Sequence, residues 1–342
     1  MLSLSPEICK RIVQNSHYWQ DVLALCLTCK AFQKDAEVKL YSQLQFTDPR
    51  RAVLACNTLL DNERLALHVR GFWFNQQNDR QRPTNLGREF WSLIQKTLIA
   101  MSNLEALVLC DRSYANGWVL EHPGIQFKLK EAKLWFVWNA ALTAFLDRQD
   151  TLQTFHFVDS LDVINHQVTP NALPCLRIFD GTLMVTMQLL SCPLVHLQVI
   201  VDADSNPAIV LLQQLGHLRK TLTSLNLLDV PEEWSTRFLG TVSLALPDLK
   251  HIGIFPYPIV SVGYIYHVHL ALTITSHLEA RVLQTLDADA FPEEYWCRHR
   301  KVATCSHDTR WPASSCFRAP DLLFFNPTCN VLDGQLSSQV VI

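Results

Sequence analysis

The stretch LEALVL, residues 104–109, carries the pattern that decides the fold of this chain. An apolar residue is followed by two others, a second apolar residue, one other, and a third apolar residue. The pattern recurs in LKEAKL from Leu129, LQTFHF from Leu152, LRIFDG from Leu176, LVHLQV from Leu194, LTSLNL from Leu222 and LKHIGI from Leu249. The copies begin 18 to 28 residues apart, and LALHVRGFWF from Leu65 is a poorer match.

Each copy predicts a short strand, because apolar side chains alternate with others over its second half. The segments between copies favour helices, as in residues 89–101, 139–147 and 207–218. Prolines 174, 193 and 247 stand shortly before strands, where a helix should already have ended. We therefore expect the fourth residue of each copy, its second apolar position, to point into one core and to lie in register along one parallel sheet. These positions include Leu107, Leu197, Leu225 and Ile252.

A strand plus a helix at a period in the twenties is typical of a solenoid, in which stacked repeats share a core that no single repeat could bury. Residues 50–280 resemble degenerate leucine-rich repeats. The Asn or Cys that follows the strand motif in that family is absent here. Those places hold Arg112, Val137, Ser160, Met184, Asp202, Val230 and Tyr257, so the turns must be held in another way. The alternative is an ordinary α/β domain whose buried strands produce the same pattern.

The composition indicates a large apolar core and reduced thiols. The 342 residues are 49% hydrophobic and 18% charged, and the net charge of −3 gives no overall attraction to nucleic acid or an anionic membrane. Eleven cysteines at irregular spacing, and no leader pattern at Met1, favour the cytoplasm or nucleus. Residues 258–275 are apolar, but they contain two histidines and two tyrosines, and we expect buried core there rather than a membrane span.

Three short helices are expected at the N-terminus. Ser5 and Pro6 suit a first helix start, and Ile8, Ile12 and Val13 form its apolar stripe. A second helix is expected to begin at Asp21. A third helix should carry Phe32, Ala36 and Leu40, spaced four residues apart.

The pair Cys26-x-x-Cys29 falls on one predicted stripe of the second helix, together with Val22 and Leu25. Free cysteine packs like a small hydrophobic residue, so we interpret the pair as core. A thioredoxin-like site would need a preceding strand, and a zinc site would need two further ligands nearby.

The segments LSPEICKRIV and DVLALCLTCKAFQKDAEVKLYSQLQF resemble an F-box of the form common in fungal proteins. The resemblance covers about residues 1–46; Ser5 separates Leu4 from Pro6, and Phe32 stands where many F-boxes carry Trp. It implies binding to the small Skp adaptor of a cullin-based ubiquitin ligase. Apolar residues that three small helices cannot bury among themselves are the expected contacts: Leu4, Pro6, Ile8, Ile12, Leu23, Leu27 and Phe32.

The tail, residues 285–342, loses the periodicity and is expected to be an irregular cap. Its Cys297, His299, Cys305 and His307 are zinc-ligand types, but the spacing of common zinc fingers is not met, and we predict no metal site. The short basic run 298–301 is expected to be a solvated turn.

The expected fold class is α/β: a three-helix F-box over residues 1–46, an irregular leucine-rich-repeat-like solenoid with parallel strands and outer helices over 47–284, and the tail. Motifs of phosphate loops, serine hydrolases and zinc proteases are absent, so we expect no enzyme and no cofactor. The predicted function is a substrate adaptor of a cullin-type ligase, with the repeats binding a protein substrate. The alternatives are a scaffold that binds Skp without recruiting a cullin, and a hydrolase hidden in an α/β domain.

Overall fold

The computed structural model describes residues 4–75, 86–158, 166–201, 211, 213–230 and 232–256. All of them belong to one compact unit, residues 1–283. The apolar stretch 258–275 and the tail, with its cysteines and histidines, lie outside the described residues.

The three N-terminal helices are α1 (Pro6–Asn15), α2 (Trp19–Thr28) and α3 (Lys30–Ser42). Helix α1 begins as expected, with Ser5 at the N-cap and Pro6 in the first turn, although the Ser5 side chain makes no capping hydrogen bond. The prediction that α2 begins at Asp21 was wrong. Its N-cap is Tyr18, and Asp21 lies in the first turn, where a carboxylate is also favourable beside the helix N-terminus.

These helices share a small core of their own. Val13, Val22 and Ala36 are buried together, one from each helix. Leu25, Cys26, Phe32 and Leu40 pack around them, as the predicted stripes of the second and third helices required. Helices α1 and α2 each pack on α3.

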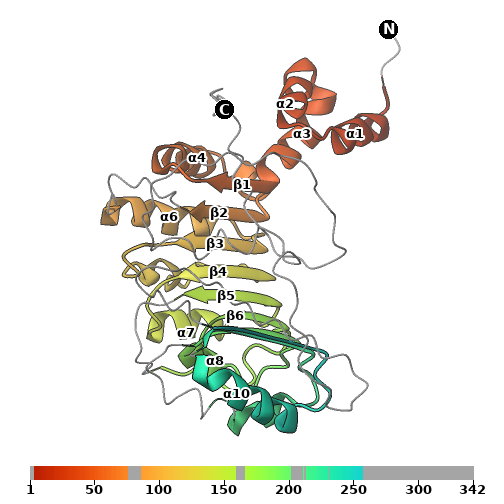
Figure 1. Ribbon diagram of the computed structural model, residues 1–342. Helices are drawn as coiled ribbons and strands as arrows, with labels where there is room; N and C mark the ends of the chain where they lie inside the picture. Colours follow the sequence, from red (N-terminus) through yellow and green to blue (C-terminus); the bar gives the residue numbers. More distant parts are fainter. Residues whose placement is uncertain are drawn as a thin grey trace, which may run out of the picture. The chain divides into compact units, whose positions relative to one another are not determined.

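A sheet of nine parallel strands follows, with its strands side by side in chain order (Figure 1). This order confirms the α/β class and the parallel strands. The strands are β1 (Gln43–Phe46), β2 (Gly71–Asn75), β3 (Ala106–Cys110), β4 (Glu131–Trp135), β5 (Thr154–Val158), β6 (Ile178–Thr182), β7 (His196–Ile200), β8 (Ser224–Val230) and β9 (His251–Pro256).

All seven predicted copies became strands, and the poorer copy from Leu65 contains β2. Strand β1 was not expected: residues 43–46 were assigned to the F-box segment, but they pair with β2. The register carries one row of inward side chains through the sheet. Its members are Leu44, Phe72, Leu107, Ala132, Phe155, Phe179, Leu197, Leu225 and Ile252. The prediction that Leu107, Leu197, Leu225 and Ile252 share one row is therefore confirmed.

The helices lie in the segments that connect consecutive strands, and they cover the buried face of the sheet. They are α4 (Pro49–Asp61), α5 (Glu63–Ala66), α6 (Arg88–Ala100), α7 (Ala140–Leu146), α8 (Leu183–Gln188) and α10 (Glu232–Ala245), with 3-10 turns η1 (Gly117–Leu120) and η2 (Leu215–Leu218). Helices α4, α6 and α7 lie on one side of the sheet in Figure 1. Trp91, Ile94 and Leu98 of α6 belong to the same buried cluster as the strand residues.

The predicted helices at 89–101 and 139–147 correspond to α6 and α7. The Asn139 side chain caps α7 by accepting a hydrogen bond of 3.0 Å from the Leu142 N–H. Helix α10 ends two residues before Pro247, as the proline predicts. The predicted helix at 207–218 falls partly outside the described residues and ends in η2.

The same backbone contact recurs where the strands begin. The Arg70 carbonyl accepts hydrogen bonds of 2.8 and 2.9 Å from the N–H groups of Glu105 and Ala106. Six more carbonyls each accept two hydrogen bonds in the same way, from the first two N–H groups at the start of the next strand. They belong to Glu105, Lys130, Gln153, Arg177, Val195 and Thr223. This repeated pairing holds successive repeats in register.

The turn after β3 is held by the side chain of Asp111. The buried Asp111 carboxylate accepts hydrogen bonds of 3.0 Å from the backbone N–H groups of Ser113 and Asn116 and one of 3.0 Å from the Asn116 side chain. Asp111 is one residue before the position where the family's Asn was sought. A side chain at this neighbouring position can therefore satisfy the turn's orphan N–H groups.

Candidate functional site

Most of the residues predicted to contact a partner remain uncovered on the N-terminal helices. Leu4, Ile8, Ile12 and Leu27 are 54%, 42%, 37% and 80% exposed, and Pro6 is exposed as well. The inward positions of α1 are instead Cys9 and Val13. Exposed aliphatic side chains on so small a helical unit would be removed from water by burial against another protein, and this gain opposes the rotamer entropy that they lose.

The other two predicted contacts are half-buried. Leu23 and Phe32 are partly accessible, and Phe32 packs against the small core of Val13, Val22 and Ala36. Phe32 therefore contributes to the unit's own stability, whereas Leu27 does not.

The cysteine pair is not a shared stripe. Cys26 packs on the small core, but Cys29 is exposed and has extended backbone angles between α2 and α3. Our assignment of both residues to one helical face was wrong because α2 ends at Thr28, before the heptad spacing reaches Cys29. Burial, and to a lesser degree the Glu37 charge, raises the pKa of Cys26, which is unfavourable for a reactive thiolate. Among the residues that the structure describes, no group of three or more His, Cys, Asp or Glu side chains could hold a metal ion.

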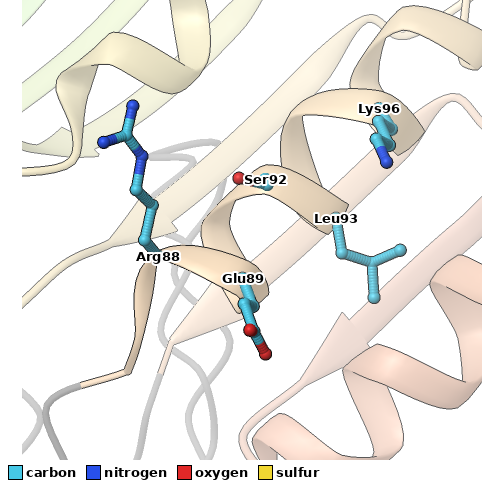
Figure 2. A pocket seen from close by; sticks show the side chains of 5 residues that line it. All are labelled: Arg88, Glu89, Ser92, Leu93 and Lys96. Atoms are coloured by element: carbon cyan, nitrogen blue, oxygen red, sulfur yellow. The ribbon is translucent and has the colours of Figure 1, made fainter.

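Two depressions on the described residues offer little convergent chemistry. The larger is a depression of about 610 Å³ lined by Arg88, Glu89, Ser92, Leu93 and Lys96, all from α6. Arg88 and Glu89 point away from each other in Figure 2. A second depression of about 260 Å³ lies between α1 and α3 and includes Lys10 and Asp35. Neither arrangement resembles an enclosed substrate pocket.

The second candidate surface is the face of the sheet that points away from the core, which we call the open face. Strands β4 to β7 alternate buried and partly exposed residues, so every second side chain lies on this face. Its central row follows from the register and is polar over five strands: Lys133, His156, Asp180, Gln198 and Asn226.

Three members of this row form one hydrogen-bonded network. The Asp180 carboxylate lies 3.1 Å from Nδ1 of His156 and accepts a hydrogen bond of 2.8 Å from Nε2 of Gln198. A carboxylate partner requires Nδ1 of His156 to carry the proton. Both groups of the His156–Asp180 pair are about one-sixth exposed, so their orientations are fixed at an accessible surface. In the described part of the chain no hydroxyl or thiol is bonded to His156, and a nucleophile–histidine pair is missing there.

Aromatic side chains extend the open face beyond the polar row. Trp73 lies in the same row on β2, and its ring covers Gly71. A Cβ atom on Gly71 would stand 1.9 Å from the ring, so the position requires glycine. Trp135 lies on the next open-face row of β4, and within the described residues its buried Nε1 finds no hydrogen-bond partner.

This surface was not expected from the sequence, although the strands that build it were. The signal was present in the penultimate residue of each copy, which reads Val108, Lys133, His156, Asp180, Gln198, Asn226 and Gly253. Only the register shows that these residues are neighbours.

No helix in the described residues is long and apolar enough to cross a membrane. No protein-family model matches the chain, and no curated protein is similar to it.

Proposed function

We propose that the chain is a non-enzymatic adaptor of a cullin-type ubiquitin ligase. Its N-terminal helices dock on the Skp subunit as an F-box does, and its sheet is a leucine-rich-repeat-like array that holds a protein substrate. The reactions of ubiquitin transfer belong to the other subunits. Such an adaptor works in the cytoplasm or nucleus.

The observation that carries the proposal is the exposed apolar set Leu4, Ile8, Ile12 and Leu27 on a unit with a core of its own. A partner that covers these side chains would remove apolar surface from water, worth roughly 25 cal/mol per Å². The spacing of the second-helix motif gives the partner its identity, by resemblance to F-boxes.

The repeated strand pattern and the open face support the substrate half of the proposal. A regular array of parallel strands presents one side chain per strand at fixed intervals, which suits the recognition of an extended partner segment. His156, Asp180 and Gln198 are held in one network there, so their orientation is set before binding.

The test is a binding measurement between the full chain and purified Skp, followed by addition of the cullin. Wild-type chain should bind Skp, and the cullin should join the complex. Leu27→Asp should weaken Skp binding by more than about thirtyfold, because it places an unpaired charge in an apolar contact.

Leu54→Asp is the matched control. Leu54 is 52% exposed, but it lies on α4, outside the three N-terminal helices. It should leave Skp binding unchanged. Absence of wild-type binding, or equal effects of the two variants, overturns the adaptor proposal. A Skp complex that excludes the cullin identifies a scaffold instead of a ligase adaptor.

A further inference from the structure

The residues directly before the strands form a row across the end of the sheet at which the parallel strands begin. Each carbonyl from Arg70 to Thr223 accepts backbone hydrogen bonds from the start of the next strand, and the last member, Lys250, donates its N–H to the Thr223 carbonyl, so the residues are neighbours in space. The row reads Arg70, Glu105, Lys130, Gln153, Arg177, Val195, Thr223 and Lys250. We call it the strand-start edge; four of its members are basic and one is acidic.

The loops that lead into the edge are basic too. Within six residues before each of β2 to β9, all in the described part of the chain, the basic residues are Arg70, Lys128, Lys130, Arg148, Arg177, Arg219, Lys220 and Lys250. The acidic residues in the same windows are Glu105, Asp150 and Asp248. A chain with a net charge of −3 thus concentrates positive charge at one edge of its sheet.

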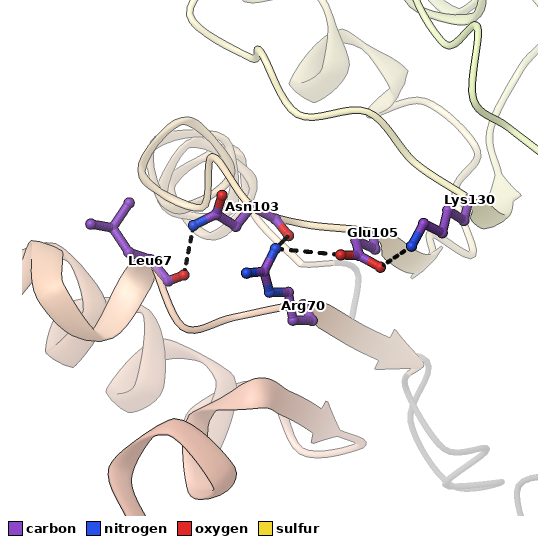
Figure 3. A network of polar contacts seen from close by, with 5 residues as sticks. All are labelled: Leu67, Arg70, Asn103, Glu105 and Lys130. Atoms are coloured by element: carbon purple, nitrogen blue, oxygen red, sulfur yellow. Dashed lines mark hydrogen bonds and ion pairs between the residues drawn. The ribbon is translucent and has the colours of Figure 1, made fainter. Parts of the chain in front are cut away.

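Glu105 places a carboxylate between two cations of this edge. Its carboxylate lies 3.3 Å from Nη1 of Arg70 and 2.7 Å from Nζ of Lys130, bridging cations that are two strands apart (Figure 3). The hydrogen bond from Lys130 is the main cause that lowers the pKa of Glu105. All three side chains are between 39% and 59% exposed, so the bridge stands at an accessible surface.

We propose that the strand-start edge binds an acidic segment of a partner polypeptide, laid across the strands. Carboxylates of that segment bind Lys130, Arg177 and Lys250 as Glu105 binds Arg70 and Lys130. The identity of this partner as the ligase substrate rests on the proposed function. The edge itself involves none of the N-terminal helices.

The spacing of the cations favours a polypeptide. Arg70, Lys130 and Arg177 precede β2, β4 and β6, and adjacent strands are about 4.8 Å apart, so these cations recur at about 10 Å. An extended polyproline II segment returns to the same side every three residues, or about 9.3 Å. An acidic residue at every third position therefore meets Arg70, Lys130 and Arg177 in turn, and Lys250, three strands beyond Arg177, lies about 14 Å further along the segment.

The test uses fluorescence anisotropy with the full chain and a labelled peptide of about twelve residues that carries Glu at every third position. A peptide with Gln in place of Glu and a single-stranded oligonucleotide of similar length serve as comparison probes. The Glu peptide should bind, more weakly as salt rises, while the Gln peptide should not.

The double charge reversal Arg177→Glu with Lys250→Glu should lower the affinity for the Glu peptide by at least about tenfold, since each reversal replaces an attraction with a repulsion. Neither residue belongs to an ion pair with another described residue, although Arg177 donates to the Pro193 carbonyl at 3.2 Å. The matched control is Lys34→Glu with Lys96→Glu, which reverses two exposed charges on α3 and α6. The affinity of this control variant for the Glu peptide should stay within about twofold of that of wild type.

Glu105→Gln provides a second, opposite test. It removes the carboxylate that competes for Arg70 and Lys130, so the Glu peptide should bind a few-fold more tightly. A purely structural role for Glu105 would not raise affinity. The proposal fails if the Glu peptide binds no better than the Gln peptide, if the edge variant equals its control, or if the oligonucleotide binds as tightly as the Glu peptide. Skp binding is measured separately, so a failure here leaves the adaptor proposal standing.

Discussion

The ammonium group of Lys39 on α3 donates a hydrogen bond of 2.6 Å to the carbonyl oxygen of Ser16, just beyond the end of α1. The same Nζ reaches the Val13 and Gln14 carbonyls at 2.9 and 2.8 Å. One side chain thus binds three carbonyls at the C-terminus of α1, where a helix leaves its last carbonyls without intrahelical partners, and the Val13 carbonyl also accepts from the Ser16 N–H at 3.2 Å. This contact fixes α1, which carries Ile8 and Ile12, on α3.

We expect Lys39→Met to loosen α1 without disturbing the sheet. Loss of three charge-assisted hydrogen bonds at a partly exposed site should cost the N-terminal unit about 1–2 kcal/mol. Hydrogen exchange of residues 6–15 should accelerate, while exchange in β3 to β7 should not change. Lys34→Met, an exposed position on the same helix, is the control; equal acceleration in both variants would refute the capping role.

Phe32→Ala should lower both stability and Skp binding, whereas Leu27→Ala should lower Skp binding alone. Phe32 packs on the small core, so its truncation should lower the stability of the three helices and weaken Skp binding by about thirtyfold. Leu27 is 80% exposed, so Leu27→Ala should weaken binding while the melting temperature stays constant. Circular dichroism melting and Skp titration together check both variants. A stability loss for Leu27→Ala would contradict the exposed position of its side chain.

Gly181→Ala should destabilise the sheet by overpacking. A Cβ atom there would lie 2.6 Å from Cζ of Phe179 and 2.8 Å from the Phe157 carbonyl oxygen, closer than real contacts allow. We expect a cost of about 1–3 kcal/mol in urea unfolding. The double variant Gly181→Ala with Phe179→Leu should recover part of the loss beyond the sum of the single changes, because it shortens the clashing ring. Additive effects would show that the ring is not what requires glycine.

The contact of Glu37 with Arg64 should make stability depend on acid pH. The hydrogen bond from the Arg64 guanidinium is the main cause that lowers the pKa of Glu37 below its usual value of 4.5. A carboxyl whose folded pKa is depressed stabilises the fold above the unfolded pKa and loses that contribution as pH falls through the folded pKa. Wild type should therefore melt at a higher temperature than Glu37→Gln at neutral pH, and the difference should shrink below about pH 4.5. A difference that stays constant with pH would exclude this linkage.

The sequence predicted the strands and the row that joins Leu107 to Ile252, because alternation of apolar side chains is local and recurs in every copy. It also predicted α6, α7 and the packing of Phe32, Ala36 and Leu40, since spacing along one helix fixes which side chains share a face. The predicted start of α2 at Asp21 was wrong, because Asp21 is favourable both at an N-cap and in a first turn.

Tertiary structure decided the features that join distant segments. Strand β1 forms because Gln43–Phe46 can pair with β2, and four residues alone carry too weak a pattern to predict it. The network of His156, Asp180 and Gln198 joins residues 24 and 18 positions apart, and the Lys39 cap spans 23 to 26 positions. A local pattern fixes which way a side chain points from its own element. Which residues then meet depends on how strands align and helices pack, and that alignment is an outcome of the whole core.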